Sequence, residues 1–485
     1  MSTKPITGPI EATTAGVIAD QRLIGVLGDW SAEGHGGLAR RLAFALREAI
    51  TSGILEGGTR LPPERHLASL LSVSRSTVTA ALDELRGEAL LASRQGRGTE
   101  VVGTVDAGQA GQRVMGHFAS RGSGIDLAAV VPTEGAHLPA MAIRTEDLLA
   151  ARGQLEPHGL SPLREALAAR HTRLGRITEP GQIQVTHGAH HAIALTLDAL
   201  VAPGIAVAVE DPSYPGILDV IDHRRARAVA IPSDGGGPDP QALAALLRRD
   251  RPAVVYLQTG VHNPTGRLIG SARRRALAAA LDEHGDAVVL EDNTLADLAT
   301  GGRTGPGLDT LCRVAPVVTV ESLSKVAWAA LRIGWLRAGG VVAERISRVR
   351  VANDLGPSVP SQLLALQLLP HLDAMAEQRR AALAVATGHA VERLAADLPE
   401  WTVAQPHGSS ALWPELPVAD ATPFVALARR HGVHVTPGSA HVVGAGPDPH
   451  LRFCVDRPVG HVDEGIDRLA AAWRDHQARG ARAIA

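Results

Sequence analysis

Short β-rich runs alternate with helical patterns through the middle of the chain. The runs include IAVAVEDP, PAVVYLQTG, AVVLEDN and APVVTVES, and patterns such as DPQALAALLRRD and SARRRALAAALDEHG separate them. Parallel strands need crossover connections, usually helices, so this alternation predicts a mostly parallel sheet with helices on both faces. After residue 360 a long helical stretch precedes short strands near GVHVTPG and HLRFCV. We expect an α/β large domain over residues 125–360 and a smaller C-terminal α+β lobe over residues 361–485.

A different order of elements precedes this region. In LARRLAFALREAITSG apolar residues recur at helical spacing, and PPERHLASLLSVSRSTVTAALDEL predicts a short helix, a tight turn and a second helix. LLASRQGRGTEVV then predicts two short strands around glycines. Helix, helix, turn, helix and hairpin is the order of an α-rich winged helix-turn-helix domain. We place it at residues 35–102, after an N-terminal extension of residues 1–34, and expect the Gly-, Ser- and Ala-rich residues 103–124 to be a linker.

Composition excludes several classes of protein. The chain is 45% hydrophobic and 20% charged, as is usual for globular proteins, and no apolar run approaches the roughly 20 residues that span a bilayer. We therefore expect a cytoplasmic protein without a membrane partner. Cys312 and Cys454 lie far apart without metal-ligand spacing, which predicts no disulfide framework and no metal site. A net charge of −2 means that any binding of nucleic acid must be local.

The segment TSGILEGGTRLPPERHLASLLSVSRSTVTAALDELRGEALL, with SRQGRGT after it, resembles the N-terminal domain of the GntR family of transcription regulators. This resemblance implies a DNA operator as partner. Arginine forks bind guanine edges or phosphate, hydroxyls bind phosphate oxygens, and a helix N-terminus near Ser74 favours an anion. The residues expected to face DNA are Arg65, Ser74, Arg75, Ser76, Thr77 and Thr79, with Gly96 letting the wing approach a groove.

Charge in this region is only weakly positive. Residues 38–103 hold nine arginines and seven acidic residues, a net of +2, which is too little for tight binding by one module through phosphate neutralisation. A homodimer that reads two half-sites is the expected solution. The alternative is a protein-interaction module in which Arg75 is an ordinary surface residue.

One lysine stands out in the larger region. Of the 48 lysine and arginine residues only Lys4 and Lys325 are lysine, and Lys325 lies in ESLSKVAWAALRIGW. A deprotonated lysine amine can condense with an aldehyde to form a Schiff base, whereas a guanidinium stays protonated. Pyridoxal phosphate needs such an amine, together with a carboxylate for its ring nitrogen, a phosphate cradle and a ring-stacking partner.

Each of these groups has a candidate at the end of an expected strand. Asp292 ends AVVLED, Tyr214 follows another strand in VEDPSYPG, and Asn263 lies in the turn of QTGVHNPTG, where its amide could reach the cofactor's 3-oxygen. Ligands of open α/β sheets bind at this edge. The candidates for the phosphate are the helix start at Gly188, Ala189 and His190, with the Ser322 hydroxyl and the Arg332 guanidinium.

These phrases resemble pyridoxal-phosphate enzymes of the fold-type I aminotransferase class. The matching motifs are NPTG, SLSK, RIGW and LRFCV, and the resemblance covers roughly residues 125–480. It implies that Lys325 carries the Schiff base, Asp292 pairs with the pyridinium and Asn263 bonds the 3-oxygen. It also implies that Tyr214 stacks on the ring, that Arg452 binds a substrate or effector carboxylate, and that dimers build each site from both subunits.

The chain departs from that class at two tyrosines. EDNTLADL has Thr294 and Leu295 where a tyrosine usually follows the pyridinium aspartate, and QLEPHGLSPLREAL lacks the second tyrosine expected before its glycine. Losing two donors should weaken cofactor binding and slow proton transfer. This puts turnover in doubt more than cofactor binding.

Joined together, the two regions resemble the MocR-type subgroup of bacterial regulators. We expect a homodimeric transcription regulator in which pyridoxal phosphate on Lys325 senses an amine, an amino acid or a vitamer. One alternative is an active aminotransferase with an appended DNA-binding domain. The other is a regulator that has lost pyridoxal phosphate.

Overall fold

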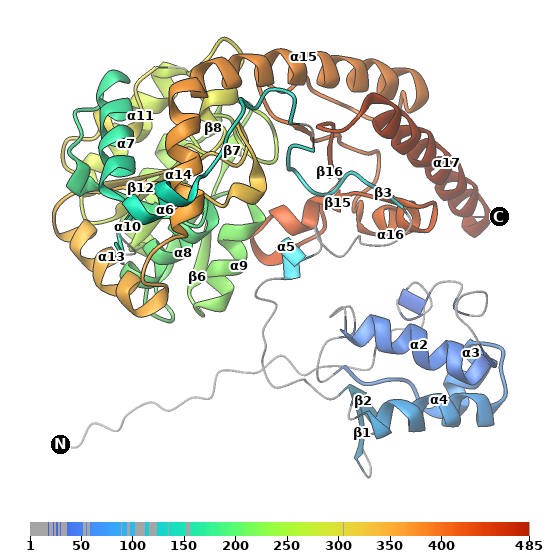
Figure 1. The fold of residues 1–485 in the computed structure, drawn as a ribbon. Helices are drawn as coiled ribbons and strands as arrows, with labels where there is room; N and C mark the ends of the chain where they lie inside the picture. The colour runs from blue at the N-terminus through green and yellow to red at the C-terminus, as the bar shows by residue number, and fades with distance from the viewer. Residues whose placement is uncertain are drawn as a thin grey trace, which may run out of the picture. The chain divides into compact units, whose positions relative to one another are not determined.

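The chain forms two compact units, residues 1–108 and residues 109–485 (Figure 1). The computed structural model describes residues 18, 23, 26, 27, 30, 36–51, 55, 59–88, 90–94, 98–101, 112–115, 124–133, 135–151, 156–303 and 305–484.

The first unit is a winged helix-turn-helix, as expected. Its elements follow the predicted order of three helices and a hairpin: α2 (Leu38–Thr51), α3 (Glu64–Leu70), α4 (Arg75–Gly87), β1 (Leu91–Arg94) and β2 (Gly98–Val101). The two strands pair antiparallel, with Leu91 opposite Val101. On α4 the fully buried residues are Val78, Ala81, Leu82 and Leu85, which are spaced to lie on one face of a helix.

Part of the expected N-terminal extension belongs to this unit. Leu23, Leu27 and Trp30 are buried in the same hydrophobic core as α2 and α4. These three residues of the expected extension therefore contribute to the core of the first unit.

A seven-stranded sheet forms the centre of the second unit, in the order β4-β12-β11-β10-β9-β5-β6. Only β12 runs antiparallel to its neighbours β11 and β4, so the sheet is mostly parallel, as predicted. The strands are β4 (Ile183–Thr186), β5 (Ala206–Glu210), β6 (Arg227–Ile231), β9 (Val254–Leu257), β10 (Val288–Asp292), β11 (Val317–Ser322) and β12 (Gly334–Arg337).

Helices cover both faces of this sheet. Along β9, Val254 and Tyr256 pack into a core with α8, α9 and α13, whereas Val255 and Leu257 pack into a second core with α10 and α11. This alternation follows from the two-residue period of a strand, and burial on both faces explains the continuous apolar runs. The helices are α7 (Ser161–Arg173), α8 (Ala189–Leu200), α9 (Pro215–His223), α10 (Pro240–Asp250), α11 (Ser271–His284), α13 (Gly340–Asn353) and α14 (Val359–Leu368).

The C-terminal lobe is α+β, as expected. Figure 1 shows the long α15 (Leu372–Asp397) running from the sheet region toward this lobe, where α16 (Thr422–Arg430) and α17 (Val459–Ile484) pack beside short strands. Three of those strands, β13 (Ala411–Leu412), β16 (Leu451–Cys454) and β15 (Thr436–Pro437), form one sheet. The remaining short elements are α6 (Thr145–Ala150), α12 (Leu308–Leu311), β7 (Ser233–Asp234), β8 (Gly237–Pro238), η1 (Pro180–Gln182), η2 (Ala296–Leu298), η3 (Ala329–Leu331), η4 (Leu369–His371), η5 (Gly438–His441) and η6 (Val443–Ala445).

Two short segments near residue 125 differ from the expected organisation. Strand β3 (Ile125–Asp126) pairs with β14 (Val433–His434), so these first residues of the expected large domain pack in the C-terminal lobe. Helix α5 (Gln112–Met115) lies within the expected linker and contacts α9. Pairing between segments this far apart depends on tertiary packing, which local sequence patterns do not encode.

Candidate cofactor site and DNA-binding surface

The predicted cofactor residues come together at the carboxyl ends of the parallel strands. Each follows a different strand: Gly188 follows β4, Tyr214 follows β5, Asn263 follows β9, Asp292 ends β10 and Lys325 follows β11. One cavity is lined by nine of the ten predicted side chains, namely Ala189, His190, Tyr214, Asn263, Asp292, Ser322, Lys325, Arg332 and Arg452.

Lys325 lies in the turn directly after β11. Its Nζ donates a hydrogen bond to the carbonyl of Val130, and burial lowers its pKa to about 8. Desolvation disfavours the charged ammonium, so a substantial fraction of this amine is neutral at mildly alkaline pH. A neutral amine is the form that can attack an aldehyde.

Asp292 accepts two hydrogen bonds at the end of β10. The Thr294 amide donates to Oδ1 at 2.9 Å, and the Tyr256 hydroxyl donates to Oδ2 at 2.7 Å. Tyr256 is fully buried on the neighbouring strand β9, and sequence reasoning missed it. The available signal was that only two tyrosines occur in the chain and that this one lies near the end of an apolar run, PAVVYLQTG.

Asn263 and Arg452 form a second pair in the cavity. The Nη1 of Arg452 donates to Oδ1 of Asn263 at 3.1 Å, which leaves the amide NH₂ of Asn263 as the group that faces a ligand oxygen. Gln258 donates to the Asn263 carbonyl and accepts from its amide, both at 3.1 Å, and so fixes the turn. The Asn263–Pro264 bond is cis. Arg452 comes from β16 and also donates to the carbonyl of Ala128, so the C-terminal lobe supplies one wall.

The start of α8 forms a concave backbone site. Gly188 is the N-cap residue with φ of 87°, and a Cβ there would lie 3.2 Å from Nη2 of Arg332. The glycine therefore allows both the left-handed turn and the close approach of the guanidinium. Arg332 also donates to the carbonyl of His187. Backbone N–H groups at a helix start, beside a guanidinium, are suited to a phosphate.

Ser322 and Tyr214 line the same cavity with their own contacts. The Ser322 hydroxyl donates to Ser324 Oγ at 2.9 Å, so its proton is already used within the chain. Burial, and next the charge of Asp292, raise the pKa of Tyr214, so its phenol stays neutral. The ring of His190 stands edge-on to Tyr214 with centroids 6.2 Å apart, and burial lowers the pKa of His190.

These residues fit pyridoxal phosphate. An amine, a carboxylate, an amide donor, a backbone cradle with a guanidinium, and an aromatic ring all border one cavity, and these are the groups that the cofactor requires.

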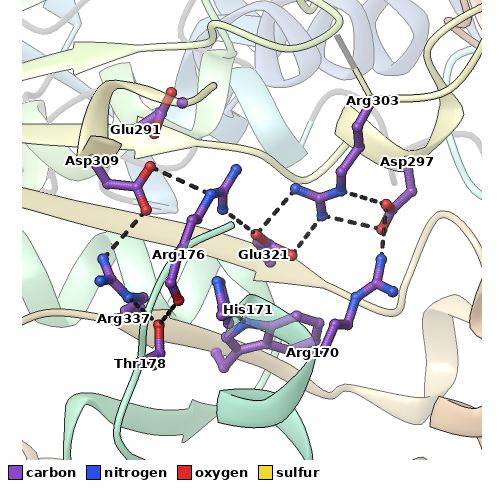
Figure 2. A network of polar contacts seen from close by, with 12 residues as sticks. Arg170, His171, Arg176, Thr178, Glu291, Asp297, Arg303, Asp309, Glu321 and Arg337 are labelled. Atoms are coloured by element: carbon purple, nitrogen blue, oxygen red, sulfur yellow. Dashed lines mark hydrogen bonds and ion pairs between the residues drawn. The ribbon is translucent and has the colours of Figure 1, made fainter. Parts of the chain in front are cut away.

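A buried network of ion pairs lies against the strands that carry the site (Figure 2). Glu321 accepts from both Arg176 and Arg303, and these arginines also pair with Asp309 and Asp297 respectively. Burial alone would raise the pKa of Glu321, but the charges of Arg303, His171 and Arg176 together with the hydrogen bond from Arg303 outweigh burial and bring that pKa to about 2. Consecutive side chains of a strand point to opposite faces, so Glu321 fixes β11 from the face opposite Ser322.

The predicted DNA-facing residues divide into two groups. Arg65, Arg75 and Ser76 are exposed, although Arg75 Nε lies 3.9 Å from the Glu64 carboxylate and the Ser76 hydroxyl lies 2.8 Å from that of Ser74. The Arg75 side chain is 59% exposed. Ser74 caps α4 by accepting from the Thr77 amide at 3.1 Å.

The remaining predicted residues are Thr77, Thr79 and Gly96 of the wing. Thr77 bonds Ser74 through its hydroxyl, and Thr79 donates to Glu64 at 2.9 Å, so both are already used within the unit. Gly96 lies outside the described residues.

Comparisons with known proteins agree with both units. The family described as aminotransferase class I and II matches residues 139–469, and the bacterial regulatory proteins of the gntR family match residues 38–101. The regulator TauR of Rhodobacter capsulatus is 29% identical, covering 91% of this chain and 97% of that protein. The regulator YdcR of Escherichia coli is 28% identical, covering 85% and 94%.

Solved structures match the second unit. An α-aminoadipate aminotransferase, LysN of Thermus thermophilus, solved with N-(5'-phosphopyridoxyl)-L-leucine, superposes with a TM-score of 0.67 at 25% identity, covering 76% of this chain and 98% of that one. A Pyrococcus horikoshii kynurenine aminotransferase has a TM-score of 0.68 at 23% identity, covering 77% and 96%. No described helix is long and apolar enough to cross a membrane. The chain therefore belongs to the class I and II aminotransferase family and carries a GntR-type DNA-binding region ahead of it, the architecture of the MocR-type subgroup of bacterial transcription regulators.

Proposed function

We propose that this transcription regulator holds pyridoxal phosphate on Lys325, senses a small amine or amino acid there, and binds its operator as a homodimer. The observation that supports this most is the grouping of Lys325, Asp292 and Arg452 around one cavity at the carboxyl ends of the strands. Ligands of open α/β sheets bind at this edge.

Each residue has a distinct proposed role. The Lys325 amine binds the aldehyde carbon, Asp292 pairs with the ring nitrogen, and the Asn263 amide donates to the 3-oxygen. Tyr214 stacks on the ring, and Arg452 binds the effector's carboxylate. The phosphate is held by Gly188, Ala189, His190 and Arg332, and by Ser322 once its hydroxyl turns from Ser324 to the phosphate.

The cofactor contributes one kind of chemistry. When bound, pyridoxal phosphate supplies an aldehyde carbon that combines reversibly with primary amines. The chain's own residues select which amine binds. Arg452 attracts an anionic group of the ligand, and the cavity walls limit the size and polarity of its other atoms. An effector can change DNA binding only if it binds two arrangements of the protein unequally.

The second candidate function is a working aminotransferase, which would use the same Lys325 amine. Turnover also needs a donor that tunes the cofactor's 3-oxygen, and Thr294 and Leu295 stand where that tyrosine is usual. The sensing function requires reversible binding alone. Incubation with an amino acid and a keto acid separates the two, since many turnovers indicate an enzyme and a stoichiometric spectral change indicates a sensor.

DNA binding is proposed to use Arg65, Arg75 and Ser76 for direct contacts, with the α4 N-terminus near Ser74 at a phosphate. The exposed side chains of the turn and of α4 support this. A homodimer would present two such surfaces and offset the weak positive charge of one.

Visible absorption of the purified protein tests the cofactor assignment. Wild type saturated with pyridoxal phosphate should show the band of the lysine-bound cofactor, and Lys325→Ala should lack it. Lys325→Arg is the matched control because it keeps the charge but cannot form the bond. A colourless wild type, or a band that persists in both variants, would show that the assignment is wrong.

A further inference from the structure

The charged side chains of the cavity limit what a ligand can carry. They are three cations, Lys325, Arg332 and Arg452, and one carboxylate, Asp292, beside the ring of His190. Under the proposed function the cofactor occupies Lys325, Arg332 and Asp292. The proposed function then assigns Arg452 to a ligand carboxylate, and the described residues that line the cavity include no further carboxylate for a second ammonium group.

The wall beside Lys325 and Arg452 is apolar. Lys325 donates to the Val130 carbonyl and Arg452 donates to the Ala128 carbonyl, so one short segment runs past both groups. Ala129, Val130 and Val131 line the cavity from that segment. A ligand held at both anchors therefore has hydrocarbon beside it.

Another part of the lining is also apolar. Val261 and Leu295 line the cavity and belong to the hydrophobic cluster that includes Val326, the residue after Lys325. A second ligand charge against these side chains would be desolvated without a partner, which is strongly unfavourable.

Resting on the proposed function, we infer that the effector is an amino acid with one carboxylate and a short, uncharged aliphatic side chain. Arg452 takes the carboxylate, the amine points to the cofactor at Lys325, and Val130, Val131, Val261 and Leu295 surround the side chain. The described residues of the lining offer no partner for a second ligand charge, so acidic and basic amino acids should bind weakly, as should amines without a carboxylate.

The expected selectivity follows from burial. Each methylene removed from water strengthens binding roughly fourfold, so leucine, with three more carbons than alanine, should bind about 50-fold more tightly. Glutamate and lysine should give no saturable change at concentrations 100-fold above that needed for leucine.

The test is a titration of the full-length protein, loaded with pyridoxal phosphate, followed in the visible spectrum. The ligands are alanine, valine, leucine, glutamate, lysine and 3-methylbutylamine. Val261→Thr, which keeps the volume but adds a hydroxyl, should reduce the leucine to alanine ratio several-fold. Arg452→Met should remove the preference for leucine over 3-methylbutylamine.

Glutamate or lysine binding as tightly as leucine would overturn this inference, and so would an unchanged ratio in Val261→Thr. The visible band of the loaded protein is read before any titration. A missing band would instead refute the proposed function, so the two failures are distinguishable.

A different observation concerns the segment that joins the two units. The backbone amides of Arg113 and Val114, in α5, donate to the carboxylate of Asp219 on α9 at 3.3 and 2.8 Å. Arg113 Nη1 donates to Asp222 at 2.6 Å. Asp219 is only 4% exposed, so α5 is held by a buried carboxylate rather than by surface charge alone.

Val114, in α5, also lines the ligand cavity. It lines the same cavity as Ile193 and Tyr214. The chain continues from the wing strand β2, which ends at Val101, to α5 and then to β3 at Ile125. The connecting segment therefore forms part of the wall of the proposed cofactor site.

We propose that docking of α5 is coupled to occupancy of that cavity. A ligand that touches Val114 binds the docked arrangement better and therefore favours it.

Trypsin tests this coupling, because Arg113 itself is a cleavage site. Pyridoxal phosphate should slow cleavage after Arg113 by about tenfold in wild type, measured by mass spectrometry of the fragments. The double variant Asp219→Asn, Asp222→Asn should keep the visible band but lose this protection. Val114→Ala, which leaves both carboxylates intact, should lose part of it. Asp234→Asn, which breaks an exposed pair with Arg273, is the matched control and should behave as wild type.

Cleavage after Arg113 at the same rate with and without pyridoxal phosphate would refute the coupling, provided that the band shows the cofactor bound. Full protection in the double variant would refute it as well.

Discussion

Tyr256→Phe isolates one hydrogen bond to the proposed ring-nitrogen partner. The Tyr256 hydroxyl donates to Asp292 at 2.7 Å, and Tyr256 is fully buried. Phenylalanine keeps the ring volume, so the variant removes the donor without opening a large cavity. A hydrogen bond to a charged group contributes about 1.5–3 kcal/mol, and the free energy of unfolding should fall by that amount.

A double-mutant cycle with Asp292→Asn assigns the loss to this pair. With a neutral acceptor the same removal should cost about 0.5–1.5 kcal/mol, which leaves an interaction free energy near 1 kcal/mol. Urea unfolding followed by tryptophan fluorescence reports it, because five of the six tryptophans lie within residues 109–485. A loss below about 0.5 kcal/mol in the wild-type background would refute the reasoning.

Three further predictions concern other parts of the protein. Arg75→Ala should weaken operator binding by about 1–3 kcal/mol in a gel shift, whereas Thr79→Val should change it less because that hydroxyl bonds Glu64; equal losses would contradict the assignment. The rate of pyridoxal phosphate uptake should rise between pH 7 and 9, with a midpoint near the Lys325 pKa of about 8, because only the neutral amine attacks the aldehyde. A rate that does not change with pH would contradict this prediction. Glu321→Gln should lower the free energy of unfolding by about 3–5 kcal/mol in urea, because it leaves buried arginine charge unpaired, and a loss below 1 kcal/mol would argue against the network. In wild type the contribution of Glu321 is present above its unfolded pKa of 4.5 and should disappear as pH falls toward about 2.

Local periodicity was enough to predict the fold of both units and most of the cavity. Strands that are buried on both faces produce continuous apolar runs, and the polar residue after each run marks the carboxyl end of a strand. Asp292 and Asn263 were found in this way, since parallel strands bring their carboxyl ends to one edge of the sheet. Lys325 was singled out because it is one of only two lysines in the chain.

Contacts that depend on neighbouring strands or on distant segments were not predictable in this way. Tyr256 reaches Asp292 only because β9 lies beside β10, and strand order is not written in either run. The pairing of β3 with β14 joins residues that are more than 300 positions apart. Helical spacing predicts that Thr79 lies near the exposed face of α4. Spacing alone does not show that Glu64, from α3, accepts a hydrogen bond from the Thr79 hydroxyl.

The distribution of lysine and arginine now has a physical explanation in β11. Arg176 and Arg303 each bind two carboxylates around Glu321, which requires a planar cation that keeps its charge when buried. Four residues after Glu321, Lys325 donates to a single backbone carbonyl and has its pKa lowered to about 8. The arginines around Glu321 thus stabilise the face of the sheet opposite Ser322 with permanent charge. The cavity contains Lys325, the one lysine of the second unit, whose amine can lose a proton. A chain that otherwise uses arginine almost throughout therefore has lysine where reversible chemistry with an aldehyde requires it.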